Sequence, residues 1–316
     1  MAIFNKILVL ALILLLIHSK INAQQKENLY LRSNSSHKNI AAFLQDGTSQ
    51  GSSTESYHLP KWYQVITNVP LDFYSFGKEI INKNSIEPVL ILSSITAGLI
   101  FTDQKNWENS KVIFKKNPDL LKISDFTVNL GEAKWQLGLA GATAIYGYFA
   151  KDNQAIQTSF ESIEAIISSG LFVQVLKRIS GRQSPAVSTK NGGQWDIFPD
   201  LGEYQHFQPN YYSYPSGHIT SLTAFLTVIN ENYPNVKWLK PASYVLIGAL
   251  GISLVQNDMH WYSDLPLGVA IGYCFGKIVS KRYNNHQLIN KNIPSSFSII
   301  PFLNEKGISV LFNYSF

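Results

Sequence analysis

The sequence predicts an all-α protein, a helical bundle that carries a short β-hairpin at its C-terminal end. Apolar residues recur at helical spacing in most segments between residues 71 and 282. Charged residues make up only 15% of the 316-residue chain, which favours a globular or membrane-associated protein over a disordered one. After residue 296 the apolar residues alternate with a period of two, which is typical of strands.

The N-terminal segment predicts export. Lys6 precedes a wholly apolar run, residues 7–17, and the small residue Ala23 stands before Gln24. This order is typical of a secretory signal peptide, and the apolar run is short for a membrane span. We therefore expect a signal peptide over residues 1–23, with an uncleaved anchor as the alternative. The mature chain is expected in the periplasm or elsewhere in the cell envelope.

The rest of the chain predicts a polar lead-in followed by one helical domain. Residues 24–60 are rich in Ser, Gln, Asn and Gly without any helical or strand period, so we expect a flexible segment. The helical domain is expected over residues 61–285. Its predicted helices cover residues 71–82, 89–102, 135–150, 156–178, 216–230, 241–255 and 265–282.

Details of these segments carry further predictions. Gly181 suits the C-terminal cap of helix 156–178. Gly138, Ala140, Gly141 and Ala142 permit close helix–helix contact within segment 135–150. Residues 103–125 are charged and predict a loop with one short helix. The connection 182–214 is rich in aromatic residues, and connections of this length inside compact domains are often functional.

The relation of the helices to a membrane stays open at this point. The charge-free runs reach about 15 to 17 residues, at or below the usual length of a membrane span. A soluble bundle and a membrane bundle with short helices both fit. We favour a compact bundle that is exported to the envelope and associated with a membrane.

The tail, residues 286–316, predicts the β-hairpin. Residues 297–301 begin one strand-like run, and residues 308–316 alternate strictly after the turn sequence 304–307. A terminal aromatic residue on an alternating strand also resembles the last strand of an outer-membrane barrel. Two strands cannot close a barrel, so we expect a hairpin docked on the helices.

Composition narrows the function. The net charge of +5 favours an anionic ligand or an anionic membrane surface, and no long basic cluster suggests nucleic acid. The single cysteine, Cys274, excludes an intrachain disulfide and a cysteine-based zinc site.

The segment Pro215-Ser216-Gly217-His218 stands directly before an apolar helical run. The first N–H groups of a helix have no intrahelical acceptor and lie at the positive end of the helix dipole. Gly217 has no Cβ and lets a tetrahedral anion approach the backbone. His218 adds a side chain that exchanges protons near neutral pH. The segment therefore predicts an anion site with a proton donor beside it.

Further polar residues lie on either side of this segment. Lys177 and Arg182 precede it and supply positive charge. His260 and Asp264 follow it four residues apart, so on one helical turn they face the same way. A carboxylate beside an imidazole raises the basicity of the other ring nitrogen. Phosphoryl transfer needs this set: charge stabilisation, an activated nucleophile and a proton for the leaving oxygen.

These residues resemble the type 2 phosphatidic acid phosphatase (PAP2) superfamily, which includes bacterial acid phosphatases and vanadium haloperoxidases. The family pattern is K-x6-R-P, then P-S-G-H, then S-R-x5-H-x3-D, and the three motifs occur here in that order. The second motif is complete. The first matches at Lys177 and Pro185, and the third at Ser253, His260 and Asp264. The resemblance covers roughly residues 70–282 and implies a helical bundle of the PAP2/haloperoxidase type.

The resemblance also implies a role for each residue. His260 attacks phosphorus and forms a phosphohistidine, and Asp264 orients it. His218 protonates the leaving group and later activates water. The phosphoryl oxygens are held by Lys177 and by the N–H groups of Ser216 and Gly217. No metal or other cofactor is required, and the chain shows no obvious carboxylate cage for magnesium or zinc.

Two arginines of the family pattern are absent. The first motif has Ser184 and the third has Leu254 where the family carries an arginine that contacts phosphate. One charge-assisted contact contributes about 1.5–3 kcal/mol, so the loss of two would slow catalysis severely. We expect Arg182 to take over this phosphate-binding role. Weaker candidates are Lys190, Gln194 and Asn257.

These observations predict an exported, metal-independent phosphatase that acts on a phosphate monoester or a diphosphate. A lipid phosphate near a membrane is the expected substrate, because the aromatic connection and the apolar helices suit an acyl or prenyl chain; a small soluble phosphate ester is the close alternative. The missing arginines favour a second hypothesis, a weak or inactive relative that binds anions or serves as an envelope scaffold. A vanadate-dependent haloperoxidase is the third.

Overall fold

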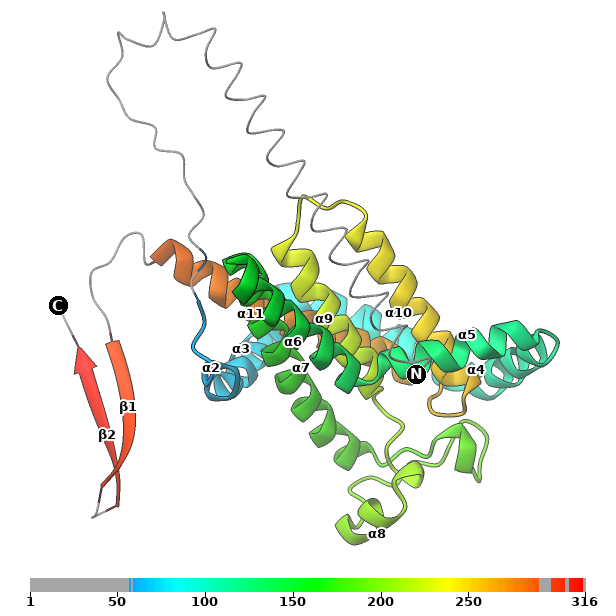
Figure 1. Cartoon of the computed structure of the whole chain (residues 1–316). Coiled ribbons are helices and arrows are strands. Elements are labelled where there is room, and N and C mark those ends of the chain that lie inside the picture. The colour runs from blue at the N-terminus through cyan, green and yellow to red at the C-terminus, as the bar shows by residue number, and fades with distance from the viewer. Residues whose placement is uncertain (1–56, 58, 290–296, 305–306, 315–316) are drawn as a thin grey trace, which may run out of the picture. The chain divides into compact units, whose positions relative to one another are not determined.

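The computed structural model describes residue 57 and residues 59–289, 297–304 and 307–314. The predicted signal peptide and almost all of the predicted lead-in lie outside the described residues. Residues 57–289 form a bundle of helices, which confirms the predicted all-α class (Figure 1). The α-helices are α2 (Gln64–Thr67), α3 (Val69–Ile81), α4 (Ile86–Lys115), α5 (Pro118–Gly131), α6 (Ala133–Ala150), α7 (Asn153–Ser180), α8 (Leu201–His206), α9 (Gly217–Asn232), α10 (Leu239–Gln256) and α11 (Asp264–Ile289). Short 3-10 helices are η2 (Lys83–Ser85), η3 (Pro185–Val187) and η4 (Gln208–Asn210).

The prediction for residues 103–125 is wrong. The structure continues α4 without a break to Lys115 and begins α5 at Pro118. No glycine or proline interrupts the chain between Gly98 and Pro118. The polar side chains of this part of α4 also have partners on the connection between α10 and α11. Trp107 Nε1 donates to Asp258 Oδ1 at 2.7 Å, and Lys111 pairs with the other oxygen of Asp258 at 2.7 Å.

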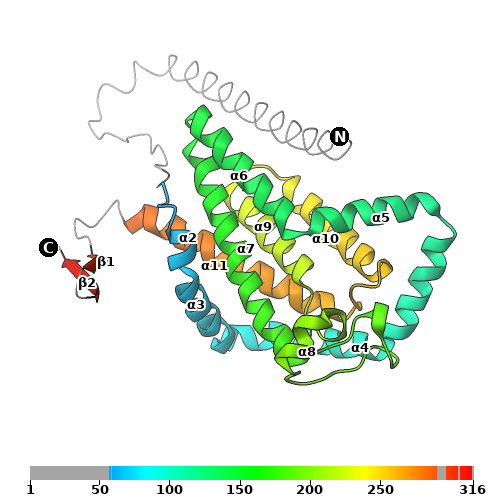
Figure 2. The same cartoon turned by 60° about the horizontal axis from the view of Figure 1, so that its bottom comes forward.

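Helices α7, α9 and α11 lie side by side and form the centre of the bundle (Figures 1 and 2). Three glycines of α11, four residues apart, lie directly against α9. A Cβ at Gly268 would stand 2.7 Å from the Ser216 carbonyl oxygen, and one at Gly272 2.3 Å from that of Thr220. Gly276 meets Ala224 in the same way, at 2.9 Å. This row of three glycines allows the start of α9 to pack directly against the start of α11.

Of the small residues predicted to allow close packing in segment 135–150, the two glycines do not do so, whereas Ala140 does. A Cβ at Gly138 or Gly141 would meet nothing within 4 Å. Ala140 of the same helix is buried, and Gly147 lies against Ile156 of α7. The spacing Gly268-x3-Gly272-x3-Gly276 was the more informative signal in the sequence.

Helix α7 ends in a sharp turn that leads towards the long connection. Gly181 has a φ of +52° and caps the helix, as predicted, with its N–H donating to the Lys177 carbonyl. A Cβ at this position would lie 1.8 Å from the Asp196 carbonyl oxygen, so only glycine fits. The backbone of Arg182, the next residue, forms isolated β-bridges with Trp195 and Tyr212 of the long connection.

The tail contains two strands, β1 (Phe297–Asn304) and β2 (Gly307–Tyr314), which pair antiparallel with Phe297 opposite Tyr314. The docking of this hairpin on the helices stays a prediction.

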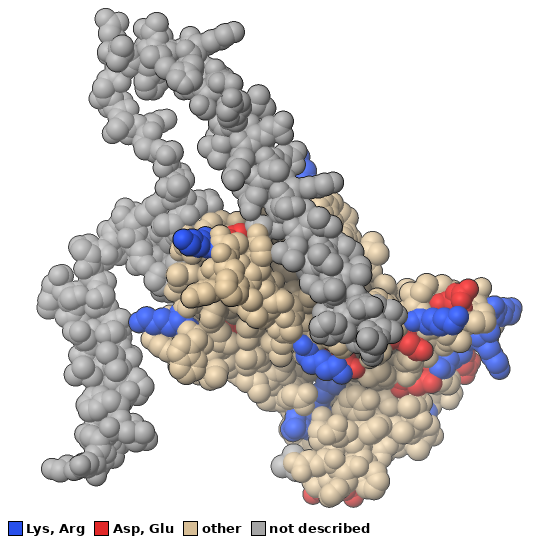
Figure 3. All heavy atoms as spheres, in the orientation of Figure 1, with Lys and Arg blue, Asp and Glu red and all other residues tan. Residues whose placement is uncertain are grey.

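Within the described part of the chain, three helical segments are long and apolar enough to cross a membrane: Lys83–Lys115, Asn153–Ser180 and Leu239–Gln256. The first of them is largely unburied, and its Phe101 side chain is 89% exposed. Many of the charged side chains visible in Figure 3 gather at the end formed by α4 and α5. The length and composition of these segments therefore suit a bilayer.

A buried ionic cluster lies between α3, α7 and α11. Arg282 of α11 donates to Glu164 of α7 at 2.5 Å and also to Asp72 of α3. Both carboxylates are 0% exposed. Ser168 donates to Asp72 at 2.6 Å, and Tyr283 donates to Glu164 at 2.9 Å. One arginine therefore pairs with two buried carboxyl groups.

Arg282→Met is expected to lower the free energy of unfolding by about 3–5 kcal/mol, because it leaves the charges of Asp72 and Glu164 without a cation. Denaturant titration of the protein in detergent measures this change. Lys277→Met on the same helix is the matched control. It breaks the partly exposed pair with Glu231 and should cost about 1 kcal/mol or less. Equal losses in the two variants would contradict the prediction.

Candidate active site

The predicted site residues meet where three helix ends come together. Lys177 lies in the last turn of α7, Gly217 opens α9, and Asp264 opens α11. The spacing predicts that His260 and Asp264 share a helical turn, and this is wrong. His260 precedes α11 and lies in the connection from α10. Its Nδ1 lies 3.5 Å from Asp264 Oδ2. The structure thus brings Lys177, Gly217, His218, His260 and Asp264 into one region.

The imidazole of His260 is held in one tautomer. Its Nδ1 lies 2.7 Å from the backbone carbonyl oxygen of Ser213. A carbonyl oxygen only accepts hydrogen bonds, so Nδ1 must carry the proton and Nε2 keeps its lone pair. Nε2 is buried and has no hydrogen-bond partner among the described residues. The nearest orienting group is therefore the Ser213 carbonyl rather than Asp264.

Burial also keeps His260 neutral. Removal from solvent lowers the pKa of His260, and the positive charge of Lys177 adds to this effect. The hydrogen bond and the charge of Asp264 act in the opposite direction but do not compensate. A neutral imidazole with a free Nε2 lone pair is the form that a nucleophile requires.

Asp264 is held as a carboxylate by several donors. Oδ2 accepts from the Ser213 hydroxyl at 2.5 Å and from the Trp261 N–H at 2.7 Å. Oδ1 accepts from the Arg182 guanidinium at 2.6 Å. Burial opposes ionisation, but the charge of Arg182 and the hydrogen bonds outweigh it, so the pKa of Asp264 lies below its usual value.

Arg182 does not make the contacts that its predicted phosphate-binding role requires. Its side chain is 0% exposed, and its five N–H groups match five acceptor contacts. They reach Asp103, Asp264, the Ser263 hydroxyl and, twice, the Gly192 carbonyl. The guanidinium is also stacked near Trp195, at 4.7 Å from the ring centroid. No donor is left for a phosphate oxygen, so Arg182 does not replace the missing arginines in this structure.

Lys177 lies beside the start of α9. Its Nζ donates to the Tyr212 carbonyl at 2.5 Å and lies 4.9 Å from the centroid of the Tyr212 ring. A Cβ at Gly217 would stand 4.0 Å from this Nζ. Glycine at position 217 thus keeps the space between the backbone of α9 and the ammonium group open. A phosphoryl oxygen in this space would meet a cation and a helix N-terminus together.

The N–H groups of Ser216 and Gly217, both predicted to hold phosphoryl oxygens, differ in whether they are free to bind a ligand. The Ser216 N–H donates to the Asp264 carbonyl at 3.0 Å and is not free for a ligand. The N–H groups of Gly217 and His218 belong to the first turn of α9, where a helix provides no acceptor. The Ser216 hydroxyl is buried and has no partner among the described residues. The hydroxyl of Ser216, rather than its N–H, is thus the group available to an anion.

His218 faces His260. The two ring centroids are 6.1 Å apart with an interplanar angle of 71°. Burial, together with the charges of His260 and Lys177, lowers the pKa of His218 to about 3. A phosphate dianion bound among these groups acts in the opposite direction and favours the protonated imidazole. His218 is therefore placed to gain a proton when an anion binds.

The two positions that lack the family arginines are filled without new cations. Leu254 is 0% exposed and packs with Ile219 and Leu250 in the core. Ser184 is buried, and its hydroxyl has no partner among the described residues. The amide of Asn257, one of the weaker candidates, donates to Ser124 and to the Ser253 carbonyl. Lys177 is thus the one predicted cation that the structure places beside α9.

Three residues at this site were not predicted. Ser213 donates to Asp264 and lies two residues before Pro215, and Ser263 directly precedes Asp264 in the sequence. Asp103 comes from α4 and is 0% exposed. Its only sequence signal is a carboxylate at the end of a long apolar run, where a charge in an apolar helix often has a specific partner.

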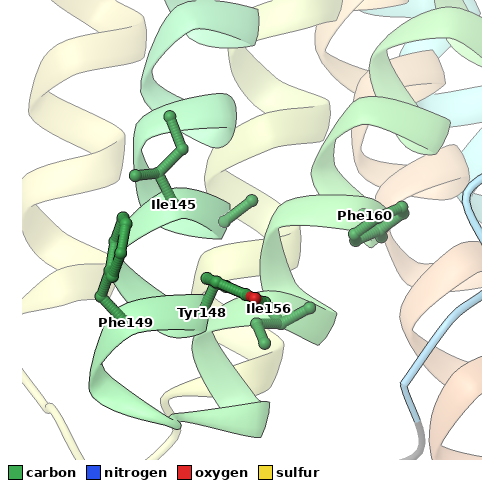
Figure 4. A pocket seen from close by; sticks show the side chains of 6 residues that line it. Ile145, Tyr148, Phe149, Ile156 and Phe160 are labelled. Carbon is green, nitrogen blue, oxygen red and sulfur yellow. The ribbon is translucent and has the colours of Figure 1, made fainter.

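An apolar pocket is lined by residues of α6 and α7. These residues are Ala144, Ile145, Tyr148, Phe149, Ile156 and Phe160 (Figure 4). Phe160 and Lys177 share α7 and lie roughly 25 Å apart along the axis at 1.5 Å per residue. This pocket is therefore separate from the histidine site.

Comparison with known proteins gives one family. Residues 160–288 match the family model of the PAP2 superfamily. A lipid A 1-phosphatase of Porphyromonas gingivalis is 36% identical over 67 residues, which cover 21% of this chain and 15% of that protein. A lipid A 1-phosphatase of Rhizobium etli is 28% identical over 139 residues, 42% of this chain and 54% of that protein. The match thus spans about half, or less, of the length of these relatives.

Two solved structures are also similar. The crystal structure of Aquifex aeolicus LpxE aligns with 19% identity and a TM-score of 0.41, over 55% of this chain and 93% of that one. A transmembrane PAP2 type phosphatidylglycerolphosphate phosphatase from Bacillus subtilis aligns with 16% identity and a TM-score of 0.42, over 71% and 97%.

Proposed function

We propose that this chain is a member of the PAP2 superfamily and a phosphatase that removes a phosphate group from a membrane lipid through a phosphohistidine intermediate. The observation that carries the proposal is the state of His260. Its proton is on Nδ1, its Nε2 is buried with a free lone pair, and the His218 ring lies 6.1 Å from its ring. Lys177 lies beside Gly217 at the start of the same helix as His218. A nucleophile, a cation, a helix N-terminus and a second imidazole are the parts that phosphoryl transfer uses.

The reaction takes two steps. In the first, His260 Nε2 attacks phosphorus, the N–P bond forms and the P–O bond to the leaving alcohol breaks. His218 gives its proton to the leaving oxygen. In the second, water attacks phosphorus while His218 takes one of its protons, and the N–P bond breaks to release phosphate. Asp264, fixed by Arg182 and Ser213, stabilises the positive charge on the His260 ring.

Lys177 and the first turn of α9 supply charge stabilisation for both steps. The Lys177 ammonium and the N–H groups of Gly217 and His218 are the expected contacts of the equatorial phosphoryl oxygens, with the Ser216 hydroxyl beside them. These groups do the work that a divalent cation does in other phosphatases. We therefore include metal independence in the proposal.

The substrate is proposed to be a lipid phosphate of the lipid A type. Two relatives are named as lipid A 1-phosphatases, and three helical segments here are long and apolar enough for a bilayer. The long connection beside the site also exposes large apolar side chains, among them Phe198 (72%) and Phe207 (61%). We place residues 61–285 in or on an envelope membrane, after a signal peptide at residues 1–23.

Phosphate release from the purified chain in detergent micelles tests the function. The substrates are lipid A with its 1-phosphate, phosphatidic acid and a soluble aryl phosphate, each with and without EDTA. We expect release from the lipids that EDTA does not reduce, with a kcat/KM at least about tenfold above that of the aryl phosphate. Release from none of them would favour the anion-binding or scaffold alternative. Loss of activity in EDTA would remove metal independence.

A further inference from the structure

Asp103 connects α4 to the candidate site, although α4 lies outside the segment that matches the family. Its Oδ2 accepts from the Arg182 guanidinium at 2.7 Å and from the Ser263 hydroxyl. Its Oδ1 accepts from the Ser263 N–H at 3.0 Å. Ser263 directly precedes Asp264, and Arg182 binds Asp264 at 2.6 Å. Asp103 thus binds both Ser263, which precedes Asp264 in the sequence, and Arg182, which donates to Asp264.

These groups form a chain of alternating charge. Asp103 is negative, Arg182 positive and Asp264 negative, and His260 follows at 3.5 Å. All four side chains are 0% exposed. Charges that are buried act on each other more strongly than exposed ones, because no solvent screens them. A change of charge at Asp103 or Arg182 is therefore felt at His260.

We propose that Asp103 and Arg182 are positioning residues that fix the orientation and the charge of Asp264, and through it the protonation of His260. This inference rests on the proposed phosphatase function. It assigns α4 a part in the site: without α4, the guanidinium would lose its partner on one side. The Arg182 side chain then acts on the catalytic pair and not on the phosphate.

Arg182 faces two carboxylates, so the sign of each substitution follows from charge. Arg182→Gln leaves Asp103 and Asp264 as two negative groups, which raises the pKa of Asp264 and of His260. Asp103→Asn leaves Asp264 as the only carboxylate beside the guanidinium, which lowers the pKa of Asp264 and of His260. The other titratable or charged groups around the pair are Lys177 of α7, His218 of α9, and Tyr212 and Tyr214 of the long connection. None of these is changed in the test.

The pH profile of kcat/KM for the lipid phosphate, measured on the full chain in detergent, separates positioning from a purely structural role. The acid limb, where His260 becomes protonated, should move up by about one pH unit in Arg182→Gln and down by about half a unit in Asp103→Asn. We expect kcat to fall about 10- to 100-fold in each. Asp258→Asn is the matched control, because Asp258 also ties α4 to this connection but lies in a partly exposed pair with Lys111. The acid limb of the Asp258→Asn profile should stay at the wild-type pH.

The double variant Asp103→Asn/Arg182→Gln restores the charge balance and should return the acid limb to the wild-type pH, even though kcat stays low. A double variant with a displaced limb would overturn the proposal. So would single variants whose limbs do not move while their rates fall equally. If one single variant does not fold, the other single variant is compared with the double variant: the limb of the single variant should be displaced and that of the double variant should not.

A second measurement does not need turnover. The imidazole resonances of His260, assigned by comparison with His260→Asn, report its protonation directly by NMR. The expected shifts in midpoint are the same as for the pH profile. An inactive wild type with the expected NMR shifts would contradict the proposed function and leave this inference standing. An active wild type without shifts would do the reverse.

Discussion

His260→Asn is expected to lower kcat on the lipid phosphate by at least about 10⁴-fold, because it removes the nucleophile and keeps the fold. The asparagine side chain places a nitrogen near the position of His260 Nδ1, from which it can still donate to the Ser213 carbonyl. What disappears is Nε2, the atom with the free lone pair. The variant therefore isolates nucleophilic attack from the hydrogen bond that orients the ring.

A trapping experiment distinguishes the phosphohistidine from direct attack by water. Wild type mixed with radiolabelled substrate and quenched in base should retain label, which acid then releases, because a phosphohistidine is stable in base and labile in acid. His260→Asn should retain none. His206→Asn, a change of the same kind at an exposed histidine in α8, is the control and should label and turn over like wild type. A His260→Asn variant with normal turnover would end the proposed mechanism.

Several parts of this fold could be predicted because their signals are local. Apolar periodicity located most of the long helices, and the φ-permissive Gly181 marked the end of α7. The P-S-G-H segment placed His218 at the start of α9 from four adjacent residues. In each case the residues that cause the structure lie within a few positions of the structure itself.

Other parts depend on partners far along the chain. The charged residues after Phe101 looked like a loop because their partners, Asp258, Ser263 and Arg182, follow more than 70 positions later. Once those partners are present, the polar side chains have a reason to stay helical. Sequence spacing also implied that His260 and Asp264 share a turn, but the helix begins only at Asp264, where the Trp261 N–H and the Ser213 hydroxyl bind its carboxylate.

Arg182 illustrates how charge alone misleads. A cation near a phosphate site was a reasonable substitute for the missing arginines. However, a side chain has a limited number of donors, and protein acceptors that include Asp103 and Asp264 already take those of Arg182. The structure therefore has fewer cations at the phosphate than the family pattern implies, and Lys177 with the start of α9 must carry more of the stabilisation.

His218→Asn should show a second large effect, and its size should depend on the leaving group. With a lipid or sugar phosphate, whose alkoxide is a poor leaving group, we expect kcat/KM to fall about 10²- to 10⁴-fold, because no group protonates the departing oxygen. With a nitrophenyl phosphate, whose anion leaves without a proton, the fall should be about tenfold or less. His260→Asn should reduce the turnover of both substrates alike, since both need the nucleophile.

The second step gives an independent check on His218. The residue that gave its proton to the leaving oxygen must take one from water, so His218→Asn should slow hydrolysis of the phosphohistidine as well. With the nitrophenyl substrate, the first step stays fast and the second becomes slow. A burst of nitrophenol equal to the enzyme concentration, followed by slow release, is then expected from stopped-flow absorbance. If His218→Asn reduced both substrates equally and gave no burst, His218 would act through charge or position at 6.1 Å from His260, rather than by moving protons.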